Sequence, residues 1–178
     1  NAASGAAYIA MLQGDYEGAD EILSAAQGSD KSKIAMRRAL VALQAKDYDG
    51  VKKFGIESEM DQGKLLAAEV LIAEQELDEA KELLSDLDFE NKKYSALTSE
   101  YLKWISSDDF LDHNYASAQA QWALGQYSSA VEDAASNLPQ MKMENKDMAL
   151  LLWAGRAAAI GDFINAGKIL PRKKKLKR

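Results

Sequence analysis

The fold is decided by a six-residue phrase that first stands at residues 14–19 (GDYEGA) and returns four times. The later copies lie at 46–51 (KDYDGV), 75–80 (QELDEA), 125–130 (GQYSSA) and 161–166 (GDFINA). Each copy has a small or polar residue, usually an acid or amide next, then an aromatic residue or leucine, and a small apolar residue three positions later. Five copies indicate an internal repeat, the sequence signature of a stacked array of similar units.

A second regularity accompanies the phrase. Nine residues before each aromatic residue or leucine stands an alanine: Ala7, Ala39, Ala68, Ala118 and Ala154. This spacing predicts a helical hairpin, in which the phrase ends one helix, its aromatic residue begins the next, and facing alanines let the two backbones approach closely. Glycine at three of the turns suits the left-handed residue that commonly ends a helix.

The rest of the chain also favours helix. Proline occurs only at Pro139 and Pro171, alanine is abundant, and apolar residues recur three and four apart, as in Ile22, Leu23 and Ala26. No stretch alternates apolar and polar residues with β-branched side chains. We therefore expect an all-α protein without a sheet.

The phrase and its spacing resemble the tetratricopeptide repeat (TPR), whose helix–turn–helix unit has small residues between its helices and a similar turn. The resemblance implies a right-handed α-solenoid of about five TPR-like hairpins. One interval departs from the family period of about 34 residues, because 50 residues separate Leu77 from Tyr127. The excess fits one additional helix near residues 92–106, in the segment from Asn91 to Ser106. This helix is either a specialised insertion or a packing spacer.

The composition excludes several kinds of chemistry. Among 178 residues there is no cysteine and only one histidine, His113, which removes cysteine–zinc sites, thiol nucleophiles and multi-histidine metal sites. Asp108, Asp109, Asp112 and His113 form one cluster of ligand-like residues; it is either a metal or acid–base site or the capped start of a helix, and we favour capping. We predict no enzyme activity, no catalytic residue, no metal and no cofactor.

The large aromatic residues can be interpreted either as a binding site or as part of the core. Trp104, Trp122 and Trp153 could form a cage or stack on nucleic acid together with Tyr8, Tyr94, Tyr101 and Tyr115, but a small helical array needs large side chains for its core. We interpret most of them as core residues.

Charge divides the chain into two parts. Six of the 22 basic residues lie in the last seven positions, so the remainder has 16 basic against 28 acidic residues. We predict a helical repeat domain over 1–170 and a flexible tail over 171–178. The tail is either a solvated end or a contact for nucleic acid or anionic membrane, and its basic residues are Arg172, Lys173, Lys174, Lys175, Lys177 and Arg178.

The resemblance also implies where a partner binds, because family ligands usually lie along the concave surface made by the first helix of each repeat. The matching positions are Tyr8, Met11, Lys33, Met36, Leu40, Leu43, Leu65, Glu69, Ile72, Tyr115, Gln119, Trp122, Met148 and Leu151. This surface is mostly apolar, so we expect a hydrophobic or amphipathic peptide or helix of another protein. The alternative is that the chain's own helices, or a second subunit, cover part of it.

The predicted function is thus non-catalytic: an adaptor or scaffold module for protein binding. Two alternatives remain, namely a self-assembling structural repeat protein and a module docked to membrane or nucleic acid through its basic tail. No apolar run approaches the ~18 residues of a membrane helix. We expect a soluble protein of the cytoplasm, with export or the nucleus as alternatives, and no small-molecule substrate.

Overall fold

The computed structural model describes residues 2–26 and 30–170, and this part of the chain is helical without a strand. The helices are, in order, α1 (Ala2–Leu12), α2 (Tyr16–Ser24), α3 (Lys31–Ala45), α4 (Tyr48–Glu57), α5 (Asp61–Ala73), α6 (Leu77–Ser85), α7 (Lys92–Ile105), α8 (Phe110–Ala123), α9 (Tyr127–Asn137), α10 (Lys146–Ala159) and α11 (Phe163–Ile169). The all-α class is confirmed. The predicted tail, 171–178, lies outside the described residues.

The repeated phrase marks every hairpin turn, as the sequence predicts. Its aromatic residue or leucine is the first residue of α2, α4, α6, α9 and α11. The five alanines nine positions earlier are all buried, with 0–6% of their surface exposed. Asp15, Asp47 and Asp162 each accept a hydrogen bond from a backbone N–H in the first turn of the following helix, which stabilises its start.

The residue that opens each phrase has a left-handed backbone. Gly14, Gly125 and Gly161 have φ of 78°, 79° and 80°, and Lys46 and Gln75 take the same conformation with φ of 60° and 65°. Left-handed backbone is unfavourable for residues with a Cβ atom. The hairpin geometry is therefore kept at two turns despite a local conformational cost.

The extra helix is also present. Helix α7 runs from Lys92 to Ile105, within one residue of the predicted bounds at each end. It contains the point at which the chain divides into two compact units, residues 1–102 and 103–178. The sequence predicts one domain through residue 170 and gives no sign of this division, because the boundary falls inside a helix instead of a linker.

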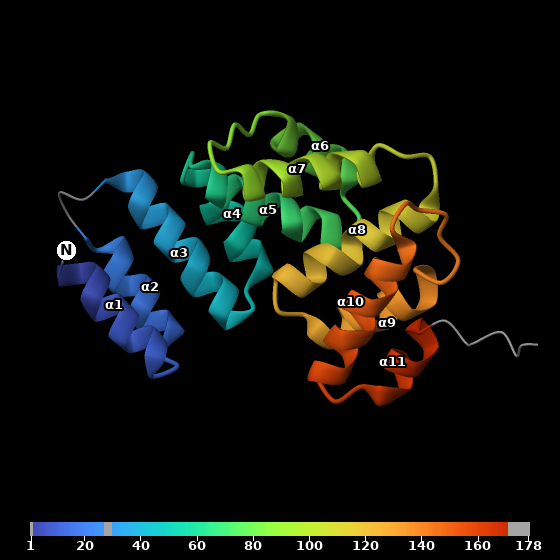
Figure 1. The fold of residues 1–178 in the computed structure, drawn as a ribbon. Coiled ribbons are helices and arrows are strands. Elements are labelled where there is room, and N and C mark those ends of the chain that lie inside the picture. The colour runs from blue at the N-terminus through green and yellow to red at the C-terminus, as the bar shows by residue number, and fades with distance from the viewer. Residues whose placement is uncertain (1, 27–29, 171–178) are drawn as a thin grey trace, which may run out of the picture. The chain divides into compact units, whose positions relative to one another are not determined.

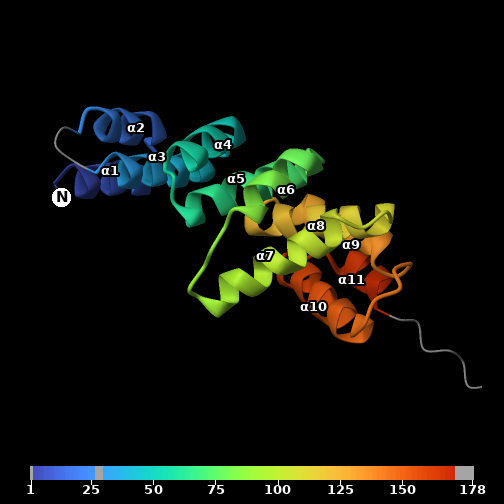
Figure 2. The same ribbon diagram turned by 90° about the horizontal axis from the view of Figure 1, so that it is seen from above.

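In the first unit, each helix from α1 to α6 packs against the next one along the chain, and Figures 1 and 2 show α1, α2 and α3 side by side. In the second unit, α8 packs on α9, while α9, α10 and α11 contact one another. The core of the second unit is built around Trp153, Leu138 and Ile169. None of the described helices is long and apolar enough to cross a membrane.

Helices α4 and α5 touch at two glycines. A Cβ atom on Gly63 would lie 2.6 Å from the carbonyl oxygen of Gly55, which is far inside van der Waals contact. We expect Gly63→Ala to lower the free energy of unfolding by about 1–3 kcal/mol through overpacking. Gly5→Ala, in α1 of the same unit, is the control: its Cβ meets nothing within 4 Å, so stability stays unchanged or rises by up to about 1 kcal/mol. Urea unfolding followed by circular dichroism measures both, and equal midpoints for the two variants would contradict the close approach.

Candidate functional site

An open apolar pocket lies between α1 and α3 in the first unit. Its volume is about 140 Å³. Residues three and four apart share a helix face, which is how each helix supplies a row of side chains to the pocket. The lining residues are Ser4, Ala7, Tyr8 and Met11 of α1, Leu23 of α2, and Arg37, Leu40 and Val41 of α3.

The pocket has a closed floor and an open rim. Ala7 and Leu23 are buried and belong to the core cluster of the first two hairpins, whereas Tyr8 and Leu40 keep 56% and 42% of their surface exposed. An apolar cavity of about 150 Å³ can hold a benzene ring. The pocket therefore has room for one large apolar side chain, entering between Tyr8 and Leu40.

Arg37 gives the pocket a positive charge. Its guanidinium donates a hydrogen bond to the hydroxyl of Ser4, a neutral acceptor. The neighbouring Arg38 differs, because it donates two hydrogen bonds of 2.6 and 2.8 Å to the carboxylate of Asp20. In the described structure, a hydroxyl thus satisfies a donor of Arg37 without neutralising its charge.

An aromatic cluster in the second unit contains three of the predicted site residues. The guanidinium carbon of Arg156 lies 4.8 Å from the ring centre of Trp122 and 4.5 Å from that of Trp153. Arg156 also donates a hydrogen bond of 2.9 Å to Gln119, whose amide donates one of 2.8 Å to the hydroxyl of Tyr115. Trp153 and Tyr115 are buried. For these two aromatics the interpretation as core is confirmed.

The predicted partner-binding residues differ in accessibility. Leu65, Glu69, Ile72 and Tyr115 are buried, with 0–5% of their surface exposed. The half-buried members of the set are Met11, Met36, Leu43, Gln119 and Trp122, and the exposed ones are Tyr8, Lys33, Leu40, Met148 and Leu151. The structure brings Tyr8, Met11 and Leu40 together in the pocket.

Sequence reasoning missed Arg37 and Ser4. The signal was available, because Arg37 lies three residues before Leu40 and Ser4 lies four residues before Tyr8. Those spacings place each on the same helix face as a predicted residue. Arg37 matters most, since it is the charged residue of the pocket.

Glu69 is a buried acid on α5. Only 4% of its surface is exposed, and the hydroxyl of Tyr101 donates a hydrogen bond of 3.3 Å to its carboxyl group. Burial raises the pKa of Glu69 to about 8, against a weaker opposing effect of the tyrosine hydrogen bond. Glu69 therefore binds a proton at neutral pH and is closed off from solvent.

The aspartate and histidine cluster near residue 110 is the start of a helix. Asp109 is the N-cap residue of α8 and accepts a hydrogen bond of 2.9 Å from the backbone N–H of Leu111, which confirms the capping interpretation for Asp109. The Nε2 atom of His113 lies 2.6 Å from the backbone oxygen of Ser107. In the described ranges, no group of three or more histidine, aspartate or glutamate side chains is arranged to hold a metal ion.

The pocket between α1 and α3 is thus the most accessible arrangement of predicted site residues in the first unit. It combines an apolar floor, two exposed apolar side chains at the rim and one arginine. Comparison with known proteins adds no assignment: no protein-family model, no curated protein and no solved structure matches this chain.

Proposed function

We propose that this chain is a non-catalytic protein-interaction module that binds an apolar peptide or helical segment at the pocket between α1 and α3. The observation that carries the proposal is the pocket itself, with buried Ala7 and Leu23 below exposed Tyr8 and Leu40. Pockets that anchor one large apolar side chain are typical of helix and peptide recognition.

We further propose that the hairpins follow one another as a right-handed, TPR-like solenoid, with the pocket on its concave surface. Support comes from the five phrase-marked turns and from the packing of each helix in the first unit against the next. Such arrays bind partners through extended concave surfaces. In this arrangement α1 and α3 are first helices of consecutive hairpins, and both contribute to the pocket.

Arg37 narrows the chemistry of the partner. A guanidinium half-buried beside an apolar pocket favours a carboxylate close to the anchoring side chain. A strongly acidic partner fits less well, because the chain carries a net charge of −6 at pH 7. The proposed ligand is therefore a segment with one leucine or aromatic anchor and one acidic residue about one helical turn away.

A random dodecapeptide library displayed on phage and selected on the full chain tests this function. We expect enrichment of sequences with an apolar anchor and a nearby acid. Leu40→Asp should weaken binding of the selected peptides at least about 10-fold, because it places a carboxylate at the rim of the apolar pocket beside the anchoring side chain. Fluorescence anisotropy with the labelled peptides measures the dissociation constants.

The matched control is Leu152→Asp. Leu152 is an exposed leucine of α10, 51% accessible, in the other unit, so this variant should bind the selected peptides as the unchanged chain does. Arg37→Ala should weaken binding less than Leu40→Asp, and its effect should shrink as salt rises. Selected peptides that bind the Leu40 variant with unchanged affinity would refute the pocket as the site.

A further inference from the structure

The hairpins share a register that allows their ends to be compared. We number positions from the first residue of each second helix, so that Tyr16, Tyr48, Leu77, Tyr127 and Phe163 are position 0. Position −7 then lies in the first helix of each hairpin. It is buried in the second and third hairpins, where Val41 and Val70 are 6% and 1% exposed. In the first hairpin it is Ile9, which is 57% exposed.

Position −7 is buried where the second helix of the preceding hairpin packs against it. Val41 packs in one cluster with Ala19 and Leu23 of α2, the second helix of the preceding hairpin. Over the described residues, no helix covers Ile9 in the same way. Together with Gly5, Ala6 and Leu12, which are also exposed, Ile9 forms an uncharged surface on α1. We call these four residues the α1 face.

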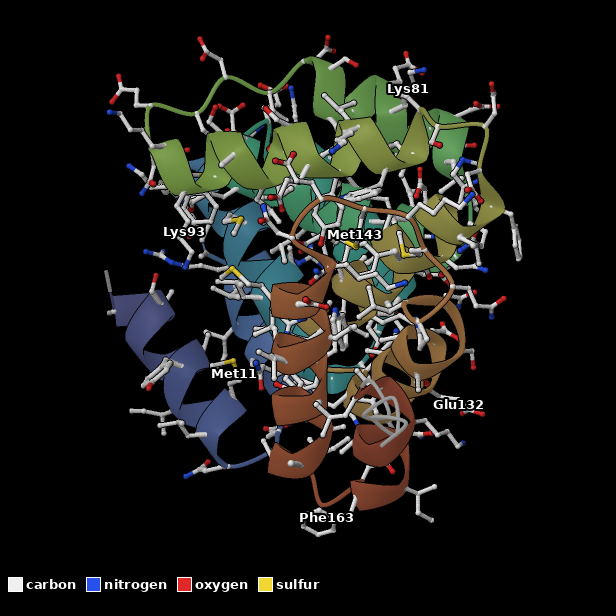
Figure 3. All side chains as sticks on the ribbon, turned by 45° about the vertical axis from the view of Figure 1, so that its right-hand side comes forward. Met11, Lys81, Lys93, Glu132, Met143 and Phe163 are labelled. Atoms are coloured by element: carbon white, nitrogen blue, oxygen red, sulfur yellow. The ribbon has the colours of Figure 1, made fainter. Side chains whose placement is uncertain are left out.

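The last hairpin has an exposed surface on its second helix, α11. Tyr16, at position 0 of the first hairpin, is partly buried against the cluster that contains Val41 of the next hairpin. Phe163, at position 0 of the last hairpin, is 73% exposed, against 47% for Tyr127 at the same position of the hairpin before it, and Figure 3 shows the ring of Phe163 pointing away from the ribbon. We call Phe163, Ile164 and Gly167 the α11 face.

Ile164 departs from the repeat. Its position, +1, is occupied at the other four turns by polar residues, namely Glu17, Asp49, Asp78 and Ser128. Ile164 is apolar and 76% exposed. An exposed isoleucine beside an exposed phenylalanine marks a surface suited to contact with another apolar surface.

The two faces also match in charge. At the junction of the first two hairpins, Arg38 at position −10 pairs with Asp20 at position +4, at 2.6 Å. The corresponding residues of the two faces are Ala6 and Gly167. Both members of the ion pair are replaced by small uncharged residues, so contact between the faces buries no unpaired charge at these positions.

We propose that a second copy of this chain joins the two faces: the α11 face of one copy packs on the α1 face of the next, with Phe163 against Ile9. The contact reproduces the packing of Tyr16 near Val41 between the first two hairpins. It is a head-to-tail contact, in which each copy offers one face and keeps the other. This proposal does not depend on the proposed peptide site, because Tyr8 and Leu40 lie off the α1 face.

The expected affinity is low. Each face has two large apolar side chains, far fewer than the roughly 20–30 residues per side of a stable interface. We expect a dissociation constant on the order of 10–100 μM. The contact is apolar, so its strength should change little between about 0.1 and 0.5 M salt, whereas association through the basic tail would fall steeply.

Sedimentation velocity of the full chain from about 10 μM to 1 mM tests the proposal. Ile9→Asp and Phe163→Asp each remove one face and should each leave the protein monomeric. An equimolar mixture of the two variants retains one intact pair of faces, and should form dimers and nothing larger. Leu152→Asp, a substitution at an exposed position outside both faces, should associate as the unchanged chain does. Circular dichroism checks that every variant keeps its helical content.

Three results would overturn the proposal. The first is a chain that stays monomeric throughout the concentration range, which would leave the faces to a different partner. The second is association that survives both substitutions or disappears at 0.5 M salt, which points to the tail or another surface. The third is a variant mixture that stays monomeric, because a symmetric contact between identical faces is not restored by mixing.

Discussion

Replacing Trp153 by alanine is expected to lower the free energy of unfolding of the second unit by about 3–5 kcal/mol. The indole ring has no exposed surface and lies at the centre of that unit's core cluster. It packs edge to face on Tyr115 and Trp122, with ring centres 6.5 and 5.9 Å apart. Alanine would leave a cavity that rigid helices cannot close and would remove one side of the contact with Arg156.

Two further variants separate this cavity effect from other causes. The indole N–H of Trp153 has no hydrogen-bond partner in the described structure, so Trp153→Phe removes an unsatisfied donor while keeping an aromatic ring. We expect it to cost about half as much as alanine or less. Leu152→Ala changes the neighbouring residue, which is 51% exposed, and should cost below about 1 kcal/mol.

The measurement uses the placement of the tryptophans. All three lie between residues 103 and 178, so their fluorescence during urea unfolding follows the second unit alone. Trp104 and Trp122 still report in the alanine variant. A midpoint for Trp153→Ala equal to that of Leu152→Ala would contradict the central packing role of the indole ring.

The turns could be predicted from the sequence because their signals are local. A capping side chain stabilises a helix start and a left-handed residue commonly ends a helix, and both effects act within a few residues. The left-handed residue is kept even where glycine is missing, at Lys46 and Gln75, whose φ is positive. The bounds of α7 follow from the excess length of one interval between turns, and they differ from the prediction by one residue.

Accessibility of the site could not be predicted in the same way, because it depends on packing between helices. Position −8 holds Tyr8, Leu40 and Glu69 in the first three hairpins. Tyr8 and Leu40 line the pocket with large exposed fractions, whereas Glu69 is buried. One signal was present in the sequence: the residues of α5 are apolar on nearly all sides of the helix, and a helix of that kind is typically enclosed. In the structure, eight of its thirteen residues are buried.

Glu69 leads to the last prediction, that Glu69→Gln stabilises the first unit above pH 8 and leaves it unchanged near pH 4.5. Burial raises the pKa of Glu69 from 4.5 to about 8 in the folded chain. Between these values the folded chain keeps a proton that the unfolded chain has released. The contribution of Glu69 to the free energy of unfolding therefore falls as pH rises from about 4.5 to about 8, by at most about 5 kcal/mol in all. Above pH 8 this contribution stays level.

Glutamine isolates this effect because it has nearly the shape of the protonated acid, can still accept a hydrogen bond from Tyr101, and does not titrate. Urea unfolding of both proteins by far-ultraviolet circular dichroism, at one-unit steps from pH 5 to pH 9, gives the difference in stability. Other titrating groups cancel in that difference. Glu79→Gln, at an exposed position of α6, should show no comparable trend, and a flat difference for Glu69→Gln would contradict its burial as a protonated acid. If the stability difference between Glu69→Gln and the unchanged chain rises with pH, enclosing the acid has a cost at neutral pH that the apolar packing of α5 offsets. The acid stands at position −8, where Tyr8 and Leu40 of the first two hairpins line the pocket.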